Sequence, residues 1–510
     1  MTILNRKELH MLTYWQSHQE YKSFLHQAKV YFDPSQRHKL FCLFGIREKL
    51  ISLNLDPVME YLSSYYSEAG RSAQNQPQIL RSFILFAFLR SEKLISCGLT
   101  KWVNFILPSE PVYCALIGCS ADSLPPLGSY YDMMNRLWLM KDRSRYSRTK
   151  TFCASKNKKK PDKPSGRGQK ASDHIGITKK LVPYLINGGD IRFNFESALQ
   201  DILLIAAVRP SVRKGLISSA SLTLSGDGTC VHTHASCFGH RLHSCPYHDT
   251  CTDITNCPKH YSDPDAAFGW DSDINDYYFG YTLYNLSIHN PEAHVDLPLL
   301  VRYTDARRHD SVNGIVALHE FRKHAPNISV KNICLDSAND NYPTYELLKH
   351  WDINPFIDLN KRTGRPDSVP ERINIDKDGT PLCNAGHRMV FWGYDRSKHA
   401  TKWRSPCVLG KCEQCEHPCS KSPYGRTIHT KPEWDIRLYT PVPRGTDEWN
   451  NIYKNRTSTE RINNRILNDY GLHSMRIHGK DHYSFFTMII CICIHLDAWY
   501  KTGHTTTSVM

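Results

Sequence analysis

Residues Ser221–Thr229, which read SLTLSGDGT, mark the point at which the sequence changes from a helical to an extended pattern. Alternating apolar and polar side chains predict a short strand over Ser221–Ser225. Gly226-Asp227-Gly228 then predicts a turn, because glycine and aspartate are favoured where a strand ends. We therefore expect the Asp227 carboxylate to be exposed at a strand end and free to bind a ligand.

The segments that follow alternate between strands and helices, which predicts an α/β fold. Asp336 directly follows one of the strands, so a second carboxylate is expected at a strand end. Asp340 is its main rival for this position, and Asp310, which precedes a helix, is a weaker one. The predicted strands are Tyr277–Ile288, Leu297–Tyr303, Val330–Leu335 and Ile353–Asp358, and the predicted helices are Ser311–Lys323 and Tyr342–His350.

Tyr453–Tyr470, YKNRTSTERINNRILNDY, carries a third carboxylate. As a helix, this segment would place Arg456, Glu460 and Asn464 on one face, because they recur at every fourth residue. Glu460 would then lie beside a cation and an amide rather than in an apolar core. The alternative is structural, since Thr457 and Glu460 have the spacing of a capping box, in which Glu460 only accepts a hydrogen bond at a helix start.

Three carboxylates from separate elements can converge on one or two divalent metal ions. Oxygen ligands with open positions for water and phosphate suit Mg²⁺, or Mn²⁺ in its place. Two such ions activate the attacking oxygen and stabilise the leaving oxygen of a phosphoryl transfer. Asp227, Asp336 and Glu460 are therefore the predicted metal ligands and catalytic residues.

The same residues resemble the motifs of a known family, the DDE-type bacterial insertion-sequence transposases. One branch of that family has Tyr, two residues, Arg, three residues, Glu, six residues and Lys. Tyr453, Arg456 and Glu460 match this signature, whereas Leu467 stands at the Lys position, so that contact is missing or supplied by Arg461 or Arg465. The other matching stretches are GDGT at Gly226–Thr229, RYTDARRHDS at Arg302–Ser311, LDSANDN at Leu335–Asn341 and PPLGSYYDMMNRLW at Pro125–Trp138.

The resemblance implies a ribonuclease H-like catalytic core with a mixed sheet, and DNA transposition, a form of DNA recombination. The expected reactions are metal-dependent cleavage at the transposon ends and strand transfer into target DNA. Tyr453, Arg456 and Arg465 would contact the phosphates of double-stranded DNA, and the active complex would be a homodimer. Two alternatives stay open: a domesticated, non-catalytic zinc-containing DNA-binding protein, and a related metal-dependent nuclease.

The chain before this core divides into a helical region and a basic segment. Residues 1–142 have helical patterns and are the expected DNA-binding domain, while residues 143–180 have the composition of a linker. Lys141–Lys170 carries twelve Lys and Arg against two Asp, out of a net charge of +14 for the chain. Concentrated positive charge favours a polyanionic partner, so Lys158, Lys159 and Lys160 are expected to contact DNA phosphate. The alternative is a solvated linker.

Eighteen cysteines in an intracellular chain are expected to be thiols or metal ligands. Cys407, Cys412, Cys415 and Cys419 have a spacing that can surround one structural Zn²⁺, with Cys383 and His387 upstream. The alternative is ordinary thiols. A second Cys/His-rich segment, at residues 230–276, begins directly after Asp227 and has spacings of no finger type.

The remaining boundaries follow from these patterns. Phe485–Leu496, FFTMIICICIHL, is too short to span a bilayer and predicts a buried element. With no signal peptide pattern in Met1–Gln16, we expect a cytoplasmic protein, associated with the nucleoid when bound to DNA, and no membrane partner. The core is expected to comprise residues 181–345, with the rest of the sheet and a Cys-rich β insertion at 346–450, catalytic helices at 451–500 and a tail at 501–510.

Overall fold

The protein has a mixed α/β architecture. Its structure, a computed structural model, describes residues 10–28, 33–138, 149–150, 176–191, 197–241, 259–271, 274–360, 366–395, 397–410 and 419–507. Two sets of predicted binding residues lie outside these ranges: the triplet Lys158, Lys159 and Lys160, and two of the four zinc-spaced cysteines, Cys412 and Cys415.

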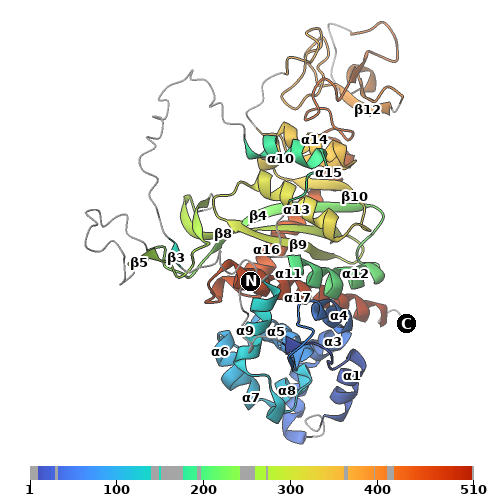
Figure 1. The fold of residues 1–510 in the computed structure, drawn as a ribbon. Coiled ribbons are helices and arrows are strands. Elements are labelled where there is room, and N and C mark those ends of the chain that lie inside the picture. The colour runs from blue at the N-terminus through green and yellow to red at the C-terminus, as the bar shows by residue number, and fades with distance from the viewer. Residues whose placement is uncertain are drawn as a thin grey trace, which may run out of the picture.

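A six-stranded sheet forms the centre of the molecule (Figure 1). Its strand order is β11-β10-β4-β8, with β9 on the other side of β8 and β7 paired to the start of β8. β10 is parallel to β4 and β11, whereas β8 is antiparallel to β4 and β9. The strands are β4 (Leu222–His232), β7 (Ala267–Asp271), β8 (Asp276–Asn290), β9 (Val295–Asp305), β10 (Val330–Leu335) and β11 (Asn354–Ile357).

The predicted end of one strand is wrong, and this changes the environment of Asp227. The expected strand Ser221–Ser225 was to end before Gly226, but β4 continues to His232 and pairs with β8 through Gly226, Asp227 and Gly228. The two glycines therefore do not form a turn. Both are buried or half-buried within the strand, where neighbouring side chains approach the backbone too closely for a Cβ atom.

Helices cover both faces of the sheet (Figure 1). On one face lie α10 (Ile177–Ile186), α13 (Asp310–His324) and α14 (Tyr342–His350), which share an apolar cluster. On the other lie α11 (Ser197–Leu203), the π-helix η7 (Leu204–Val208), α12 (Arg209–Arg213) and the long α17 (Lys480–Thr507). α17 packs along β9, so the apolar prediction at Phe485–Leu496 corresponds to a buried core helix.

The N-terminal region is helical, as predicted, but it shares one continuous apolar core with α17 and the sheet. α17 is the one helix of the described chain with the length and apolarity to cross a membrane, and 89% of that window is buried. The N-terminal α-helices are α1 (His18–Gln27), α2 (Arg37–Cys42), α3 (Phe44–Ser52), α4 (Asp56–Ser63), α5 (Gln76–Ser91), α6 (Leu99–Lys101), α7 (Leu107–Ser109), α8 (Pro111–Ile117) and α9 (Leu127–Leu137), with the π-helix η4 (Trp102–Ile106) between α6 and α7.

The predicted single helix at Tyr453–Tyr470 is divided into several shorter turns of different pitch. α15 (Asp447–Tyr453) ends at Tyr453, the 3₁₀ turn η11 (Lys454–Arg456) follows, and α16 (Thr457–Asn464) carries Glu460. The π-helix η12 (Arg465–Asp469) and the 3₁₀ turn η13 (Leu472–Ser474) then lead into α17. Arg456 and Glu460 keep their spacing of four residues, so they still share a face.

A separate small sheet lies beyond the end of the core, within the predicted Cys-rich β insertion (Figure 1). Its strands are antiparallel in the order β12 (Val390–Asp395), β13 (Ala400–Arg404) and β14 (Thr427–Thr430). They enclose their own apolar cluster, in which Trp403 and Ile428 are buried. Short two-residue strands occur elsewhere: β1 (His10–Met11) pairs with β2 (Arg71–Ser72), and β6 (Lys259–His260) pairs with β3 (Thr149–Lys150) and β5 (His240–Arg241).

Candidate metal and phosphate site

Asp227 lies in the middle of β4 at the point where the neighbouring strand β10 ends. Cys334 pairs with Ser225, so two residues further along these parallel strands Asp336 comes beside Asp227. On its other side β4 still pairs with β8, and Asn285 lies opposite Asp227. Asp227 is therefore not at the end of its own strand, β4, as the sequence predicted, but it lies beside the end of the neighbouring strand, β10.

The Asp227 side chain lies on the sheet face covered by η11 and α16. Ser225, two residues earlier and on the same face, donates to the Asn455 carbonyl at 2.8 Å, and Ser287 contacts Ser458 at 3.1 Å between hydroxyls. Only 19% of the Asp227 side chain is exposed, which is less than the sequence predicted. Its Oδ1 accepts a hydrogen bond from the Gly228 N–H at 3.0 Å.

Asp310, the first residue of α13, approaches the same strand from the opposite face. The carboxylate lies against Gly228, where a Cβ atom would collide with it. At the next glycine, Gly226, a Cβ would lie 2.8 Å from the Tyr284 hydroxyl and 2.9 Å from Leu335 Cδ2. The two glycines therefore allow acidic and phenolic groups to approach the strand that carries Asp227.

Asp336 caps the short 3₁₀ turn η9 (Ser337–Asn339) that follows β10. Its Oδ1 accepts hydrogen bonds from the Ala338 N–H at 3.2 Å and from Asn339 Nδ2 at 2.8 Å. These donors fix the side chain at the end of the strand, next to Asp227.

The three aspartates repel one another. Burial, followed by the charges of Asp336 and Asp310, raises the pKa of Asp227 to about 7, although Arg456 opposes the shift. Burial and the charge of Asp336 also raise the pKa of Asp310. Close, partly buried carboxylates are unfavourable unless a proton or a cation offsets their charge.

Several uncharged polar atoms around these acids have no hydrogen-bond partner. The Tyr284 hydroxyl, both polar atoms of the Asn285 amide and Oδ1 of Asn339 are buried without one. Burial, followed by the charges of Asp310, Asp227 and Asp336, raises the pKa of Tyr284. Buried polar groups in native proteins are normally satisfied by protein, water or an ion.

These residues fit a hydrated divalent cation in their chemistry: oxygen ligands of high negative charge, with unpartnered polar groups to bind its water. In the arrangement described, however, no three His, Cys, Asp or Glu side chains of the described chain lie close enough to form a ready-made metal site.

Glu460 contacts Arg456 rather than the aspartates. Its Oε1 lies 2.6 Å from Arg456 Nη2, and 49% of its side chain is exposed. Arg456 Nη1 in turn lies 3.9 Å from Oδ2 of Asp227, so one guanidinium separates the two acids. The capping box is absent, because the Thr457 hydroxyl donates to the Lys454 carbonyl and makes no cap at α16. The predicted alternative that Glu460 belongs to a capping box is therefore wrong.

The predicted phosphate-binding residues fall into two groups. Tyr453 lies close to the acids: it stacks on Trp449 with ring centres 4.4 Å apart, and its hydroxyl donates to the Leu335 carbonyl at 3.4 Å, just before Asp336. Arg465 instead forms an ion pair with Asp497 of α17 at 2.5 Å. The other substitute for the missing Lys, Arg461, binds Asp296 at 2.6 Å.

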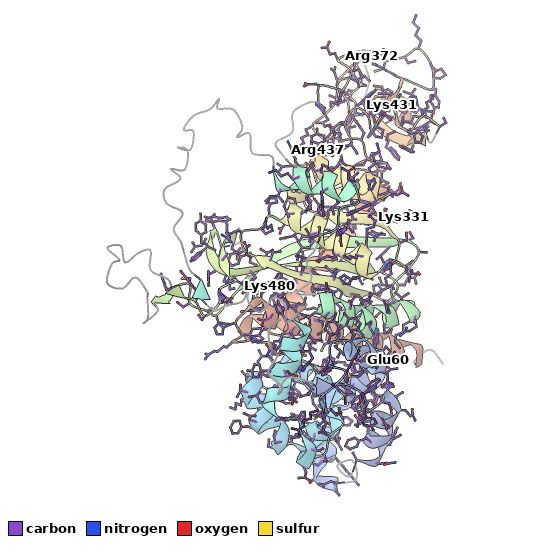
Figure 2. All side chains as sticks on the ribbon, viewed as in Figure 1. Glu60, Lys331, Arg372, Lys431, Arg437 and Lys480 are labelled. Carbon is purple, nitrogen blue, oxygen red and sulfur yellow. The ribbon has the colours of Figure 1, made fainter. Side chains whose placement is uncertain are left out.

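Asp340, the stronger rival for the second position, has a structural environment. Its side chain is fully buried and pairs with Arg437 at 3.0 Å, at the boundary between the core and the small sheet (Figure 2). It also accepts hydrogen bonds from the Tyr345 hydroxyl at 3.1 Å and the Asn360 N–H at 2.6 Å. The ranking of the two rivals is thus reversed, since Asp310 joins the acidic group and Asp340 does not.

Two of the zinc-spaced cysteines are described. Cys407 is disulfide-bonded, which differs from the expectation of a thiol. Cys419 is free, packs in the apolar cluster of Cys383, and its Sγ accepts a hydrogen bond from the Asn384 N–H at 3.2 Å. The structural zinc stays a prediction.

The second Cys/His-rich segment begins within β4. Cys230 and His232 belong to that strand, and the His232 ring stacks on Tyr278 with centres 5.0 Å apart. His234 contacts the His473 carbonyl at 2.8 Å. These contacts hold the start of the segment against the core.

The comparisons with known proteins add no identification. No protein-family model matches the chain, and no curated protein matches it.

Proposed function

We propose that this protein is a DNA transposase of the DDE type, which cleaves DNA at transposon ends and transfers the strand into target DNA with Mg²⁺ or Mn²⁺. The observation that carries the proposal is the gathering of Asp227, Asp336 and Asp310 where β10 ends beside β4. The strand order β9-β8-β4-β10-β11 with only β8 reversed supports a ribonuclease H-like core, because it agrees with the resemblance in the sequence motifs.

In this proposal Asp227 and Asp336 hold the metal ion and Glu460 completes the site. The bound metal would supply charge for the attacking and leaving oxygens. Arg456 then binds phosphate instead of Glu460, since a guanidinium can form paired hydrogen bonds with a phosphate. Tyr453 supports the phosphate beside Asp336. Asp310, with its carboxylate against Gly228, adds negative charge near the metal.

The charge of Arg456 explains how Asp227 and Glu460 can lie near each other before substrate and metal bind. Without substrate Arg456 is the cationic partner of both Asp227 and Glu460, which form no other ion pair within the described residues. A phosphate that binds Arg456 would release both acids toward the cation. We propose the same partners as the sequence predicted: double-stranded DNA, a homodimer in the active complex, a cytoplasmic location and a structural Zn²⁺ in the Cys-rich insertion.

The direct test is Mg²⁺-dependent cleavage of a duplex that contains the DNA flanking the gene. Asp227→Asn and Asp336→Asn should each lower the cleavage rate by roughly 10²-fold or more, the size typical of losing one electrostatic contributor. Asp122→Asn, an exposed aspartate in the 3₁₀ turn η5 (Ala121–Ser123), is the matched control and should cleave normally. Equal activity in all four proteins would refute the assignment.

One observation favours a non-catalytic DNA-binding protein: Glu460 is engaged by Arg456, so the site as described has only aspartates close together. This alternative predicts DNA binding by wild type and variants alike and no cleavage with either metal. A related metal-dependent nuclease would instead cleave without joining the product to a target duplex.

A further inference from the structure

A cavity of about 720 Å³ lies where the N-terminal helices meet the segment that leads into α17. One wall comes from the end of α5, α6 and α9, and the other from η13 and the start of α17. Phe86, Met134, Met475 and Phe486 contribute apolar surface, so the cavity is anchored in the shared core. Figure 2 labels Lys480, the first residue of α17, at this junction.

The polar lining of this cavity is cationic. Arg90, Lys101 and Arg476 contribute permanent positive charges, and His478 and His482 add two groups that can protonate. The described residues that line it include no Asp or Glu. Nor does any of the three cations form an ion pair with a carboxylate in the described chain. Unpaired positive charges gathered in a concave site attract anions.

Arg90 is held in place by hydrogen bonds that connect the two walls of the cavity. Its guanidinium donates to the Cys97 carbonyl at 3.1 Å, to the Gly471 carbonyl at 3.2 Å and to the Ser474 hydroxyl at 2.7 Å, so it joins α5 to η13. Its Nε is buried without a partner, and burial lowers its pKa. A half-buried cation bound only to neutral groups favours the approach of an anion.

The position of the cavity in the chain indicates which anion it takes. Tyr131 and Met134 of α9 line it, α9 ends at Leu137, and the next segment of the sequence is Lys141–Lys170 with its twelve Lys and Arg. In the sequence, the most basic segment thus begins four residues after the end of a helix that lines the cavity. A single small anion would not account for positive charge on this scale, whereas the backbone of a nucleic acid would.

We propose that this basic cavity binds backbone phosphates of double-stranded DNA, with Lys101 and Arg476 as contacts and Arg90 as the residue that positions the η13 wall. The inference rests on the proposed function, because it names a place where the DNA substrate is held apart from the acidic site. The contacts are to phosphate and therefore independent of base sequence.

The test measures the affinity of the full-length protein for a fluorescent duplex between 50 and 200 mM salt, on the order of the range where phosphate contacts dominate. The double variant Lys101→Ala/Arg476→Ala should bind about tenfold or more weakly at the low end. Its plot of log affinity against log salt should be flatter by about one unit for each lost contact.

Two controls accompany it. Lys331→Ala removes an exposed lysine on β10, far from Lys480 in Figure 2, and should leave the slope unchanged. Arg476→Lys keeps the charge and should restore most of the slope, which separates loss of a phosphate contact from misfolding.

The outcomes for the cavity and for catalysis are distinguishable. A double variant with wild-type affinity and slope overturns the cavity proposal while leaving the transposase proposal intact if cleavage is observed. A weaker, flatter salt dependence without any metal-dependent cleavage supports the cavity and overturns the catalytic assignment. Absence of DNA binding by the wild type overturns both.

Discussion

Asp336 and Asp340 are four residues apart and have opposite environments. Asp340 is fully buried and satisfied by a guanidinium, a hydroxyl and a backbone N–H. Asp336 faces two other carboxylates and a group of polar atoms without partners. Both acids accept hydrogen bonds, but Asp340 also has a cationic partner, whereas Asp336 lies near two further negative charges, which is the arrangement expected of a functional acid.

The largest effect on stability is expected from breaking the ion pair between Asp340 and Arg437. Arg437→Ala removes the cationic partner of Asp340 and leaves a buried charge unpaired. This should lower the free energy of unfolding by about 3–5 kcal/mol. Urea unfolding of the variant against wild type measures it, and a loss below about 1 kcal/mol would show that Asp340 is not the structural acid described.

Removing one of the mutually repelling acids should instead raise the free energy of unfolding. Asp227→Asn relieves repulsion from Asp336 and Asp310, so at pH 8 the variant should be more stable than wild type, by up to about 1.4 kcal/mol for each unit of pKa shift. The expected sign comes from the raised pKa of Asp227, about 7. A variant that is less stable than wild type at pH 8 without metal would contradict the repulsive cluster.

The pH dependence sharpens the same comparison. Because the folded pKa of Asp227 lies above its unfolded value, the folded protein binds the extra proton between about pH 4 and pH 7. The stability of wild type relative to Asp227→Asn should therefore be greatest near pH 4 and decline until pH rises past 7. Paired urea titrations at several pH values test this, and a difference that grows more favourable to wild type with rising pH would refute it.

Metal should offset this repulsion. At pH 8, Mg²⁺ or Mn²⁺ at 100 times its dissociation constant should stabilise the wild type by about 2.7 kcal/mol, seen as a rise in Tm. Asp227→Asn should lose most of this rise, while Asp122→Asn should keep it. A rise of equal size in all three proteins would indicate metal binding at another place.

The smallest stability effect is expected at Glu460. An exposed ion pair between residues four apart on a helix contributes about 0.3–0.5 kcal/mol, so Glu460→Gln should hardly change unfolding. Its cleavage rate should nevertheless fall roughly 10²-fold. If the variant cuts DNA as fast as wild type, Glu460 serves only as the partner of Arg456.

The local sequence pattern is sufficient to predict the bounds of some regular strands and helices. Val330–Leu335 and Tyr342–His350 have the bounds that the sequence predicted. The predicted strand is shorter than β4 because Gly226 and Gly228 are residue types that favour a turn. Only the structure shows that neighbouring side chains leave no room for a Cβ atom at these two positions. The sequence ranks Asp310 too low, because its proximity to Asp227 depends on the missing Cβ of Gly228, which the matching stretch Arg302–Ser311 does not indicate.

The Glu460 environment was partly predictable. Its spacing from Arg456 indicated a shared face, which the ion pair confirms. The distance between that pair and the two strand ends depends on how η11 and α16 pack on the sheet, and residue spacing within one helix carries no such information. The same limit applies to Arg465, whose partner Asp497 is distant in sequence.

The shared core around α17 has a consequence for synthesis of the chain. The N-terminal helices leave the ribosome first, yet α5 completes its packing against a helix that begins at Lys480, roughly 400 residues later. At about 5–20 residues per second, that interval is on the order of 20–80 s, during which the apolar surface of α5 lacks its partner. A nascent chain of this kind is a natural client for chaperones, and messages truncated before α17 should yield an aggregating product rather than a free DNA-binding fragment.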